Sequence, residues 1–370
     1  MPRTGILSIL PSIDVRSQGS FERLYHVVGK NTGNLLFTNA VWNQIEGPKE
    51  RVSFDFDPDK LNERLKALVI PAANWLSPTV DFGHMAGLVE RLTIPVVLIG
   101  LGAQDAGYSG AINIPEGTAR LVKAVAERSA SISARGEYSK QILNSLGVQS
   151  VTVTGCPSLY HDFRRFSPPP SKPRIRVDRG LIHSTRYSAS YVPFARTDSV
   201  NRQLFRFACS KQLDILYQSE PEEMALLAGF TVAEDIDDRM RGLLREIYNA
   251  RDWDSLVKYW QEHGKVYYDV GAWSNSLDAY DYVLGTRLHG TIMALNSGVP
   301  AVLVHHDSRT REMAEFAAIP SISADQLRLN SSSVEAMFRK ADLDQYYQRR
   351  EENRKKYRTF LTAQGLAPSI

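Results

Sequence analysis

The chain has 370 residues, 43% hydrophobic and 23% charged, which is enough apolar material for two packed domains. Its 44 basic and 41 acidic side chains give a formal charge of +3, which excludes the broad positive surface of nucleic-acid-binding proteins. Cys156 and Cys209 stand far apart, and no segment reaches membrane-spanning length. We therefore expect a cytoplasmic protein in a reducing compartment, and peripheral contact with the cytosolic face of a membrane stays compatible with this.

Short apolar runs alternate with polar or amphipathic stretches along both halves of the chain. The runs are GILSIL, KALVIP, PVVLIGLG, SISARG and SVTVTG, then GLIHST, LDILYQ, KVYYDV, YVLGT and PAVLVHH. Strands that alternate with helices form parallel sheets covered on both faces. The pattern predicts an α/β fold with two parallel-sheet domains.

The segment FSPPPSKPR, residues 166–174, separates the two series of strands. Its prolines prevent helix formation and remove backbone donors from a sheet. We place an N-terminal domain at residues 1–166, a linker at 167–174 and a C-terminal domain at 175–333. Residues 334–370 are highly charged with apolar side chains at helical spacing, and we expect a terminal helix on one or both domains.

The segment YVLGTRLHG brings an arginine and a histidine to the point where a strand ends and a helix begins. In open parallel sheets, ligands bind at the carboxyl ends of strands, where the following helix attracts anions. Arg287 adds a planar fork for phosphate or carboxylate, beside Thr286. His289 next to an anion is expected to stay protonated and to act as a general acid, and Gly290 lets a ligand approach the backbone. The alternative for His289 is a histidine bonded to nearby backbone.

The segment SISARGEYSK repeats this order in the first half and puts Arg135 in the place of Arg287. Two domains that face each other across a cleft would present both arginines to one ligand with two anionic groups. The alternative for Arg135 is a surface arginine paired with Glu137. Arg309, just beyond PAVLVHH, is a candidate for a third cation in the cleft.

Two further segments carry weaker signals. The loop GKNTGN leads into a helix expected to begin near Asn34. Asn31 and Asn34 are candidates to bind a phosphate or a sugar hydroxyl, although turn and capping interactions explain them almost as well. In IHSTR, His183 and Arg186 follow a strand and are expected to lie on the surface.

No pattern supports a cofactor or a metal ion. IGLGAQDAG lacks the third glycine of the dinucleotide fingerprint, so NAD is rejected. His305 and His306 are adjacent on a strand and point to opposite faces, which argues against a shared metal ion. Cys156 is expected to be a buried small residue rather than a nucleophile.

Three segments together resemble the polysaccharide pyruvyl transferase family: residues 285–320, residues 131–159 and the NTGN loop. The resemblance implies two Rossmann-like domains in a GT-B-like arrangement, with phosphoenolpyruvate in the interdomain cleft. It implies transfer of pyruvate as a ketal onto two hydroxyls of a saccharide, with release of phosphate and without a cofactor. Many members have an acidic residue where Gly136 stands here, and lysine is common where Arg309 stands.

By this resemblance, His289 is the general acid, and Arg135 and Arg287 hold the phosphate and carboxylate of the donor. The acceptor is then a precursor of an exported polysaccharide or other cell-surface glycan, and a lipid-linked form is compatible with the family. Two alternatives stay open: a GT-B glycosyltransferase with a nucleotide-sugar donor, and a non-catalytic saccharide-binding relative. Binding of a nucleotide sugar rather than phosphoenolpyruvate would indicate the glycosyltransferase. Ligand binding and a biological role that are unchanged in His289→Ala would indicate the non-catalytic relative.

Overall fold

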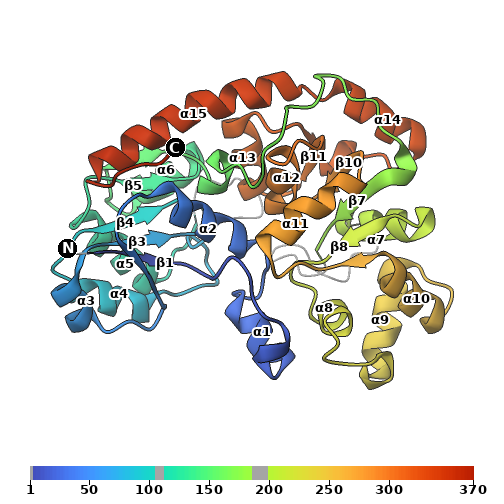
Figure 1. Ribbon diagram of the computed structural model, residues 1–370, viewed down its shortest axis with the longest axis horizontal. Coiled ribbons are helices and arrows are strands. Elements are labelled where there is room, and N and C mark those ends of the chain that lie inside the picture. The colour runs from blue at the N-terminus through green and yellow to red at the C-terminus, as the bar shows by residue number, and fades with distance from the viewer. Residues whose placement is uncertain (1–2, 105–111, 186–198) are drawn as a thin grey trace.

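The computed structural model describes residues 3–104, 112–185 and 199–370, and Figure 1 shows two α/β units side by side. The sheet of the first unit has the order β2-β1-β3-β4, and every pairing in it is parallel. Its strands are β1 (Arg3–Leu7), β2 (Lys49–Val52), β3 (Leu65–Pro71) and β4 (Val96–Ile99). A parallel pair, β5 (Ile132–Ala134) and β6 (Val151–Val153), continues it through a bridge between Leu101 and Ala134.

The sheet of the second unit has the order β12-β11-β10-β7-β8-β9 and is also parallel throughout. Its strands are β7 (Gly180–His183), β8 (Asp214–Leu216), β9 (Gly264–Lys265), β10 (Tyr282–Gly285), β11 (Ala301–His305) and β12 (Ser321–Ser323). Two parallel sheets in neighbouring units confirm the predicted α/β class and match the arrangement expected of a GT-B-like fold.

Helices connect the strands in both units. The first unit contains α1 (Phe21–Val27), α2 (Asn34–Gln44), α3 (Pro58–Arg64), α4 (Gly83–Glu90), α5 (Glu116–Ala126) and α6 (Glu137–Ser145). The second contains α7 (Val200–Lys211), α8 (Pro221–Leu227), α9 (Asp238–Tyr248), α10 (Trp253–His263), α11 (Val270–Ser276), α12 (Leu288–Leu295) and α13 (Ser308–Ala317). Short 3-10 turns include η2 (Pro157–Tyr160).

The predicted strand KVYYDV is wrong beyond its first residue, because β9 ends at Lys265. The chain leaves the sheet there and pairs with the first unit: the Ile13 amide donates to the Tyr268 carbonyl at 2.9 Å. Asp269 then caps α11. Strand β2 was not predicted, because its sequence KERV carries the charged residues typical of an exposed sheet edge.

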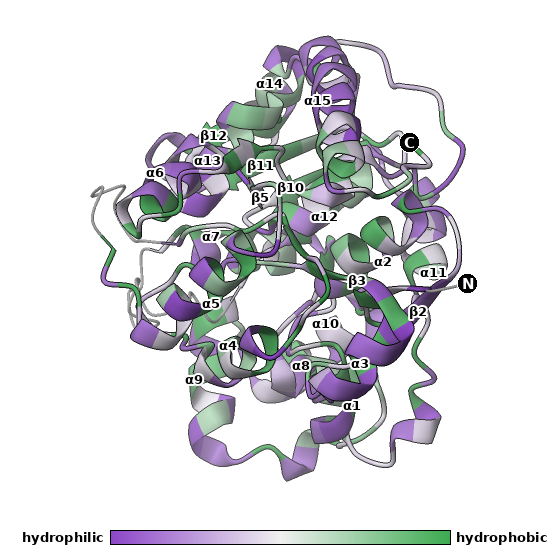
Figure 2. Cartoon of the chain, turned by 90° about the vertical axis from the view of Figure 1, so that its left-hand side faces the viewer, coloured by the Kyte–Doolittle hydropathy of each residue, from purple (hydrophilic) through white to green (hydrophobic). Residues whose placement is uncertain are grey.

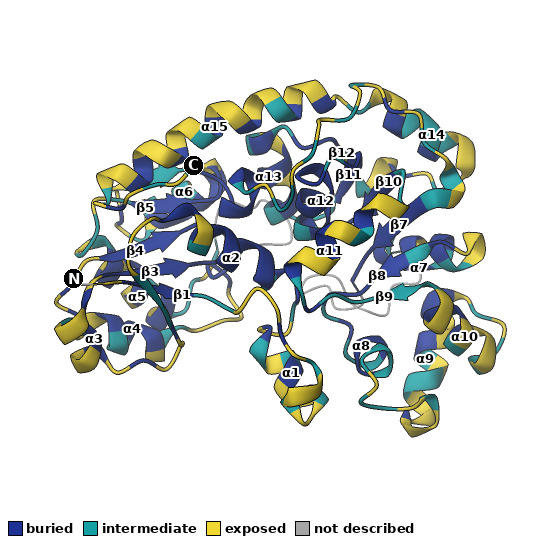
Figure 3. Cartoon of the chain, viewed as in Figure 1, coloured by how far each residue is buried: buried dark blue, intermediate teal, exposed yellow. Residues whose placement is uncertain are grey.

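Both faces of the first sheet are buried. On β3, Val69 packs into one core, whereas its neighbours Leu68 and Ile70 pack into another on the opposite face. The core that holds Val69 continues through Leu35 and Phe37 of α2 into the strands and helices of the second unit. Figure 3 shows α2 largely buried between the units. The two units therefore share an apolar core, although residues 166–174 between them lie outside helices and strands.

The terminal segment forms two helices, α14 (Ser331–Lys340) and α15 (Leu343–Ala363), rather than one. The break occurs at Asp342, whose side chain accepts a hydrogen bond from the Gln345 amide and starts α15. Helix α15 extends over both units (Figure 1), and its outward side is strongly hydrophilic (Figure 2). At its far end, the Gln364 amide group donates to the Ser131 carbonyl at 2.9 Å.

Among the described helices, none has both the length and the hydropathy needed to cross a membrane.

Candidate anion-binding site

Three cationic side chains and a histidine converge where β5, β10 and β11 end. The pKa of His289 lies well below its ordinary value, first because the imidazole is desolvated and then because of the charges on Arg135, Arg309 and Arg287. One imidazole thus experiences all three arginines, which come from both units. The structure therefore brings together the four residues that the sequence singled out.

The pKa of His289 describes the protein without a ligand, in which the neutral imidazole is favoured. The expectation of a protonated imidazole beside a bound anion stays a prediction. Burial and like charge both act against protonation. An anion placed among the arginines would oppose the second effect, so its binding would favour protonation of His289.

Helix α12 begins at Leu288, and its N-cap residue makes no side-chain hydrogen bond to the first turn. Its N-cap residue is Arg287, a cation, whereas α10 and α13 are capped by Asp252 and Asp307. An uncapped N-terminus leaves backbone N–H groups and the positive end of the helix dipole for a ligand. This turn therefore favours an anion.

Three residues that the sequence analysis did not select as ligands line His289. Phe37 of α2 stacks on the imidazole with 5.4 Å between ring centroids and 24° between planes. On another side, Cys156 Sγ lies 3.6 Å from His289 Nε2. A Cβ at Gly33 would lie 3.0 Å from His289 Nδ1, so the NTGN loop contacts the ring through its glycine. Phe37 stands one turn after Asn34, which is the only signal in the sequence that could have found it.

Arg135 is buried, with 1% of its surface exposed, so the alternative of a surface pair with Glu137 is wrong. Its Nε donates to the Gly100 carbonyl at 2.9 Å and its Nη1 to Asn74 Oδ1 at 2.8 Å. Its Nη2 donates to the Ala72 carbonyl at 3.3 Å. All three acceptors are neutral, and no described carboxylate lies within ion-pair distance. Burial lowers the pKa of Arg135, while the charge of Glu312 acts in the opposite direction from beyond ion-pair distance.

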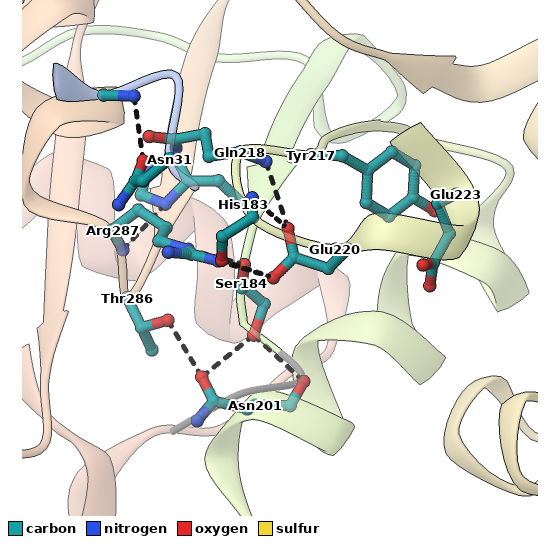
Figure 4. Close-up of polar contacts among 12 residues, drawn as sticks. Asn31, His183, Ser184, Asn201, Tyr217, Gln218, Glu220, Glu223, Thr286 and Arg287 are labelled. Atoms are coloured by element: carbon teal, nitrogen blue, oxygen red, sulfur yellow. Dashed lines mark hydrogen bonds and ion pairs between the residues drawn. The ribbon is translucent and has the colours of Figure 1, made fainter. Parts of the chain in front are cut away.

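Arg287 has a different environment (Figure 4). Its Nη2 pairs with Glu220 Oε1 at 2.5 Å, and Glu220 is fully buried. Its Nε donates to the Ser184 carbonyl at 3.0 Å, and its Nη2 also bonds to Ser219 Oγ. The backbone amides of Gln218 and Ser219 donate to Glu220 Oε2, both at 3.0 Å. The guanidinium is thus largely neutralised within the second unit.

Arg309 retains unused donors. It lies 3.3 Å from Asp307 Oδ2, and its Nε is buried without a hydrogen-bond partner among the described residues. Asp307 is also engaged as the cap of α13 through Thr310. A buried unsatisfied donor carries a cost that a ligand can remove, so Arg309 fits the predicted third cation.

The candidates in the NTGN loop make local bonds. Asn31 Oδ1 accepts from the Gly33 amide at 2.8 Å. Asn34 Nδ2 donates to the carbonyls of Val28 at 3.0 Å and Gly29 at 3.1 Å. Helix α2 begins at Asn34 as predicted. The two asparagines therefore shape the turn that presents Gly33, and a direct binding role for them stays a prediction.

The other two candidates of the second unit pack inside it. Thr286 is fully buried and donates to Asn201 Oδ1 at 2.9 Å (Figure 4). Gly290 adjoins His183, because a Cβ there would lie 2.9 Å from His183 Cδ2. Both residues support the turn around Arg287, and contact of either with a substrate stays a prediction.

His183 is fully buried, so the expected surface position is wrong. Its Nδ1 accepts from the Arg287 amide at 3.0 Å. Burial, reinforced by the charge of Arg287, lowers the pKa of His183 to about 3. It is therefore a neutral acceptor that fixes the N-cap of α12. Arg186 lies outside the described residues.

Among residues 3–104, 112–185 and 199–370, no group of three or more His, Cys, Asp or Glu side chains is placed to hold a metal ion.

Comparison with known proteins gives one family. The family described as polysaccharide pyruvyl transferase matches residues 31–308, well over half of the chain. Among curated proteins, no sequence matches.

The fold also resembles solved structures. The UDP-N-acetylglucosamine 2-epimerase of Rickettsia bellii is 11% identical, with 98% of this chain and 96% of that chain covered and a TM-score of 0.45. S. aureus MnaA with UDP is 11% identical, with 98% of each chain covered and a TM-score of 0.43. The glycosyltransferase SnogD of Streptomyces nogalater is 12% identical, with 98% and 100% covered and a TM-score of 0.37. At such identities and scores these similarities say nothing about substrate.

Proposed function

Because the chain belongs to the polysaccharide pyruvyl transferase family, we propose that it transfers pyruvate from phosphoenolpyruvate to two hydroxyls of a saccharide, as a ketal, and releases phosphate. The observation that carries the proposal is the N-terminus of α12, which its own N-cap side chain leaves uncapped and which holds His289, whose pKa the charges of Arg135 and Arg309 lower. Such a turn favours a compact ligand with several negative charges. Phosphoenolpyruvate offers a phosphate and a carboxylate only a few bonds apart.

The residues suit an acid-catalysed addition. Protonated His289 donates to the methylene carbon of phosphoenolpyruvate, the electron pair of the carbon–carbon double bond takes the proton, and the first sugar hydroxyl bonds to the central carbon. The proton of that hydroxyl returns to the imidazole. The bond between the central carbon and the phosphate oxygen then breaks, and its electron pair leaves with phosphate. The second hydroxyl closes the ketal, and its proton goes to the departing phosphate.

The arginines have separate tasks in this scheme. Arg135 and Arg309 stabilise the charge that grows on the leaving phosphate. Their charges also disfavour the imidazolium until the donor is bound. The acid is therefore charged when substrate is present and neutral when it is absent, which limits unproductive protonation.

The proposed acceptor is a saccharide precursor of an exported glycan, and a lipid-linked form would bring the protein to the cytosolic face of a membrane. An acceptor that carries two neighbouring hydroxyls satisfies the chemistry. Membership of the family supports this substrate class. The residues that contact the acceptor determine which sugar is used.

The test is a calorimetric titration of the purified protein with phosphoenolpyruvate, inorganic phosphate and a panel of nucleotide sugars. Arg309→Met and Arg311→Met form a matched pair on one helix. Arg311 is half exposed, pairs with Glu315 at 2.8 Å, and is not among the charges that lower the pKa of His289. We expect saturable binding of phosphoenolpyruvate, at least about tenfold weaker in Arg309→Met, which corresponds to about 1.4 kcal/mol. Arg311→Met should bind like the parent.

Two outcomes would contradict the proposal. Saturable binding of a nucleotide sugar, with no binding of phosphoenolpyruvate, would indicate a glycosyltransferase of the same fold. Equal affinities in the two arginine variants would place the donor elsewhere on the surface.

A further inference from the structure

Helix α6 follows Arg135 directly, yet a residue of the other unit caps it. Its own N-cap residue is Gly136, which has no side chain to offer. Glu312 of α13 supplies the cap instead: its Oε1 accepts from the Ser139 amide at 2.7 Å and its Oε2 from Ser139 Oγ at 2.8 Å. Ser139 is the third residue of α6, whose amide an N-cap side chain ordinarily bonds.

The packing around Glu312 admits no second side chain. Glu312 is only 3% exposed. A Cβ on Gly136 would lie 2.2 Å from its Cγ and 2.6 Å from its Cδ, closer than real contacts allow. The backbone of Gly136 is extended, with φ −167°, so the glycine is needed for space rather than for an unusual conformation. This glycine, where the family often has an acidic residue, is what lets Glu312 reach α6.

The contact connects the segments that carry Arg135 and Arg309. Arg309 stands one turn before Glu312 on α13, and Arg135 stands just before the capped helix. The Ser139 hydroxyl also accepts from the Ala103 amide at 2.8 Å, and the Arg135 amide donates to the Leu101 carbonyl at 2.9 Å. The carboxylate thus fixes α6 and the adjoining loop of the first unit to α13 of the second.

We propose that Glu312 is an interdomain positioning residue, which caps α6 from α13 and so holds Arg135 and Arg309 at the spacing at which both contact one anion. The cap itself is independent of the proposed function. The statement that Arg135 and Arg309 contact one anion rests on the proposed function.

The test compares Glu312→Ala with the double variant Gly136→Asp/Glu312→Ala. The single variant removes both the cap of α6 and the connection between α6 and α13. The double variant restores a carboxylate at the start of α6, from within the same unit, and has the same net charge as the parent. Glu315→Ala, on the exposed side of α13, is the matched control. Hydrogen exchange at the first turn of α6 shows whether the turn is still capped. The affinity for phosphoenolpyruvate, measured by calorimetry, shows whether Arg135 and Arg309 still lie at a spacing at which both contact one anion.

In Glu312→Ala, we expect exchange at the Ser139 amide at least about tenfold faster, because a locally opened turn loses its protection. The dissociation constant for phosphoenolpyruvate should rise about tenfold, or about 1.4 kcal/mol. In the double variant, exchange should return to within a few-fold of the parent, while the dissociation constant stays raised. Glu315→Ala should change neither.

Recovery of both readouts in the double variant would show that Glu312 is only a helix cap, and the positioning role would be wrong. Parental exchange in Glu312→Ala would show that the contact does not form in solution. If Glu312→Ala fails to fold, Glu312→Gln replaces it: a retained amide oxygen should keep exchange near the parent, and rapid exchange would refute the contact.

The exchange experiment needs no ligand, so failure of the proposed function leaves the test of the cap intact. If the parent chain does not bind phosphoenolpyruvate, inorganic phosphate is the second probe. Failure of both anions to bind would overturn the positioning role.

Discussion

Two segments of the molecule, Arg135 with α6 and Arg287 with α12, have the same order of strand, arginine and helix but opposite electrostatics. In the first, the acceptors of the guanidinium among the described residues are all neutral, and Glu312 occupies the helix N-terminus. In the second, Glu220 neutralises the guanidinium, and the helix N-terminus has no side-chain cap.

Under the proposed function, this difference would divide the binding of an anion between the units. The first segment would contribute the buried cation Arg135, and the second a helix N-terminus without a cap from its own N-cap side chain, together with His289. Neither segment has both features, so a single anion would need both. This division explains why similar sequence patterns do not imply similar roles, and the following predictions test it.

The largest expected effect is on turnover. His289→Asn should lower the rate of phosphate release in single-turnover assays with donor and acceptor by about 10²–10⁴-fold, because it removes a general acid. Donor affinity should change only a few-fold. His26→Asn, on exposed α1, is the control. A parental rate in His289→Asn would mean that the proton comes from another group.

The next effect is on stability and contrasts the two arginines. Arg287→Ala removes the cation that is paired with the buried carboxylate of Glu220 and should lower the free energy of unfolding by about 3–5 kcal/mol. Arg135→Ala leaves neutral acceptors unbonded and should cost less, about 1–3 kcal/mol. Urea unfolding measures both.

The double variant Arg287→Met/Glu220→Gln serves as the control for this contrast. It should regain much of the stability lost in Arg287→Ala, because no buried charge remains unpaired. Equal losses in Arg135→Ala and Arg287→Ala, with no recovery in the double variant, would contradict the assignment of opposite electrostatics.

The third prediction concerns acid and follows from His183, which belongs to the second segment alone. Its pKa is about 3 in the folded protein and near 6.5 when unfolded. Between these values the unfolded chain binds a proton that the folded chain does not, so stability falls as the pH falls. This histidine should contribute a slope of about 1.4 kcal/mol per pH unit between pH 6 and pH 4.

His183→Asn keeps an acceptor for the Arg287 amide and should remove that part of the slope in urea unfolding at several pH values. Other groups whose pKa values are lowered in the folded protein, such as His289 and Asp307, also contribute to the slope, so the difference between parent and variant is the quantity to measure. Identical slopes would mean that His183 is protonated in the folded state.

The smallest effect is the proton taken up when donor binds. The arginines and burial lower the pKa of His289 in the free protein, and a bound anion should raise it. Binding therefore takes up protons, and donor affinity should weaken as the pH rises between the two pKa values. Calorimetry in buffers with different ionisation enthalpies counts these protons, and the count should fall in His289→Asn. An unchanged count would place the proton on the ligand.

The sequence by itself determined the alternation of strands and helices, and with it the two parallel sheets. It also located Arg135, Arg287, His289 and Arg309, because ligands gather where parallel strands end. Local patterns were sufficient for this, since strand direction and helix starts depend on residues close together in the chain.

Only the tertiary structure decided which of these charges are free. Glu220 precedes Arg287 by 67 residues and Glu312 follows Ser139 by 173, so no local pattern could pair them. The same holds for Phe37 against His289 and for the buried His183. Burial and long-range partners set the charge and pKa of each side chain, and these arise only when the two units pack around one core.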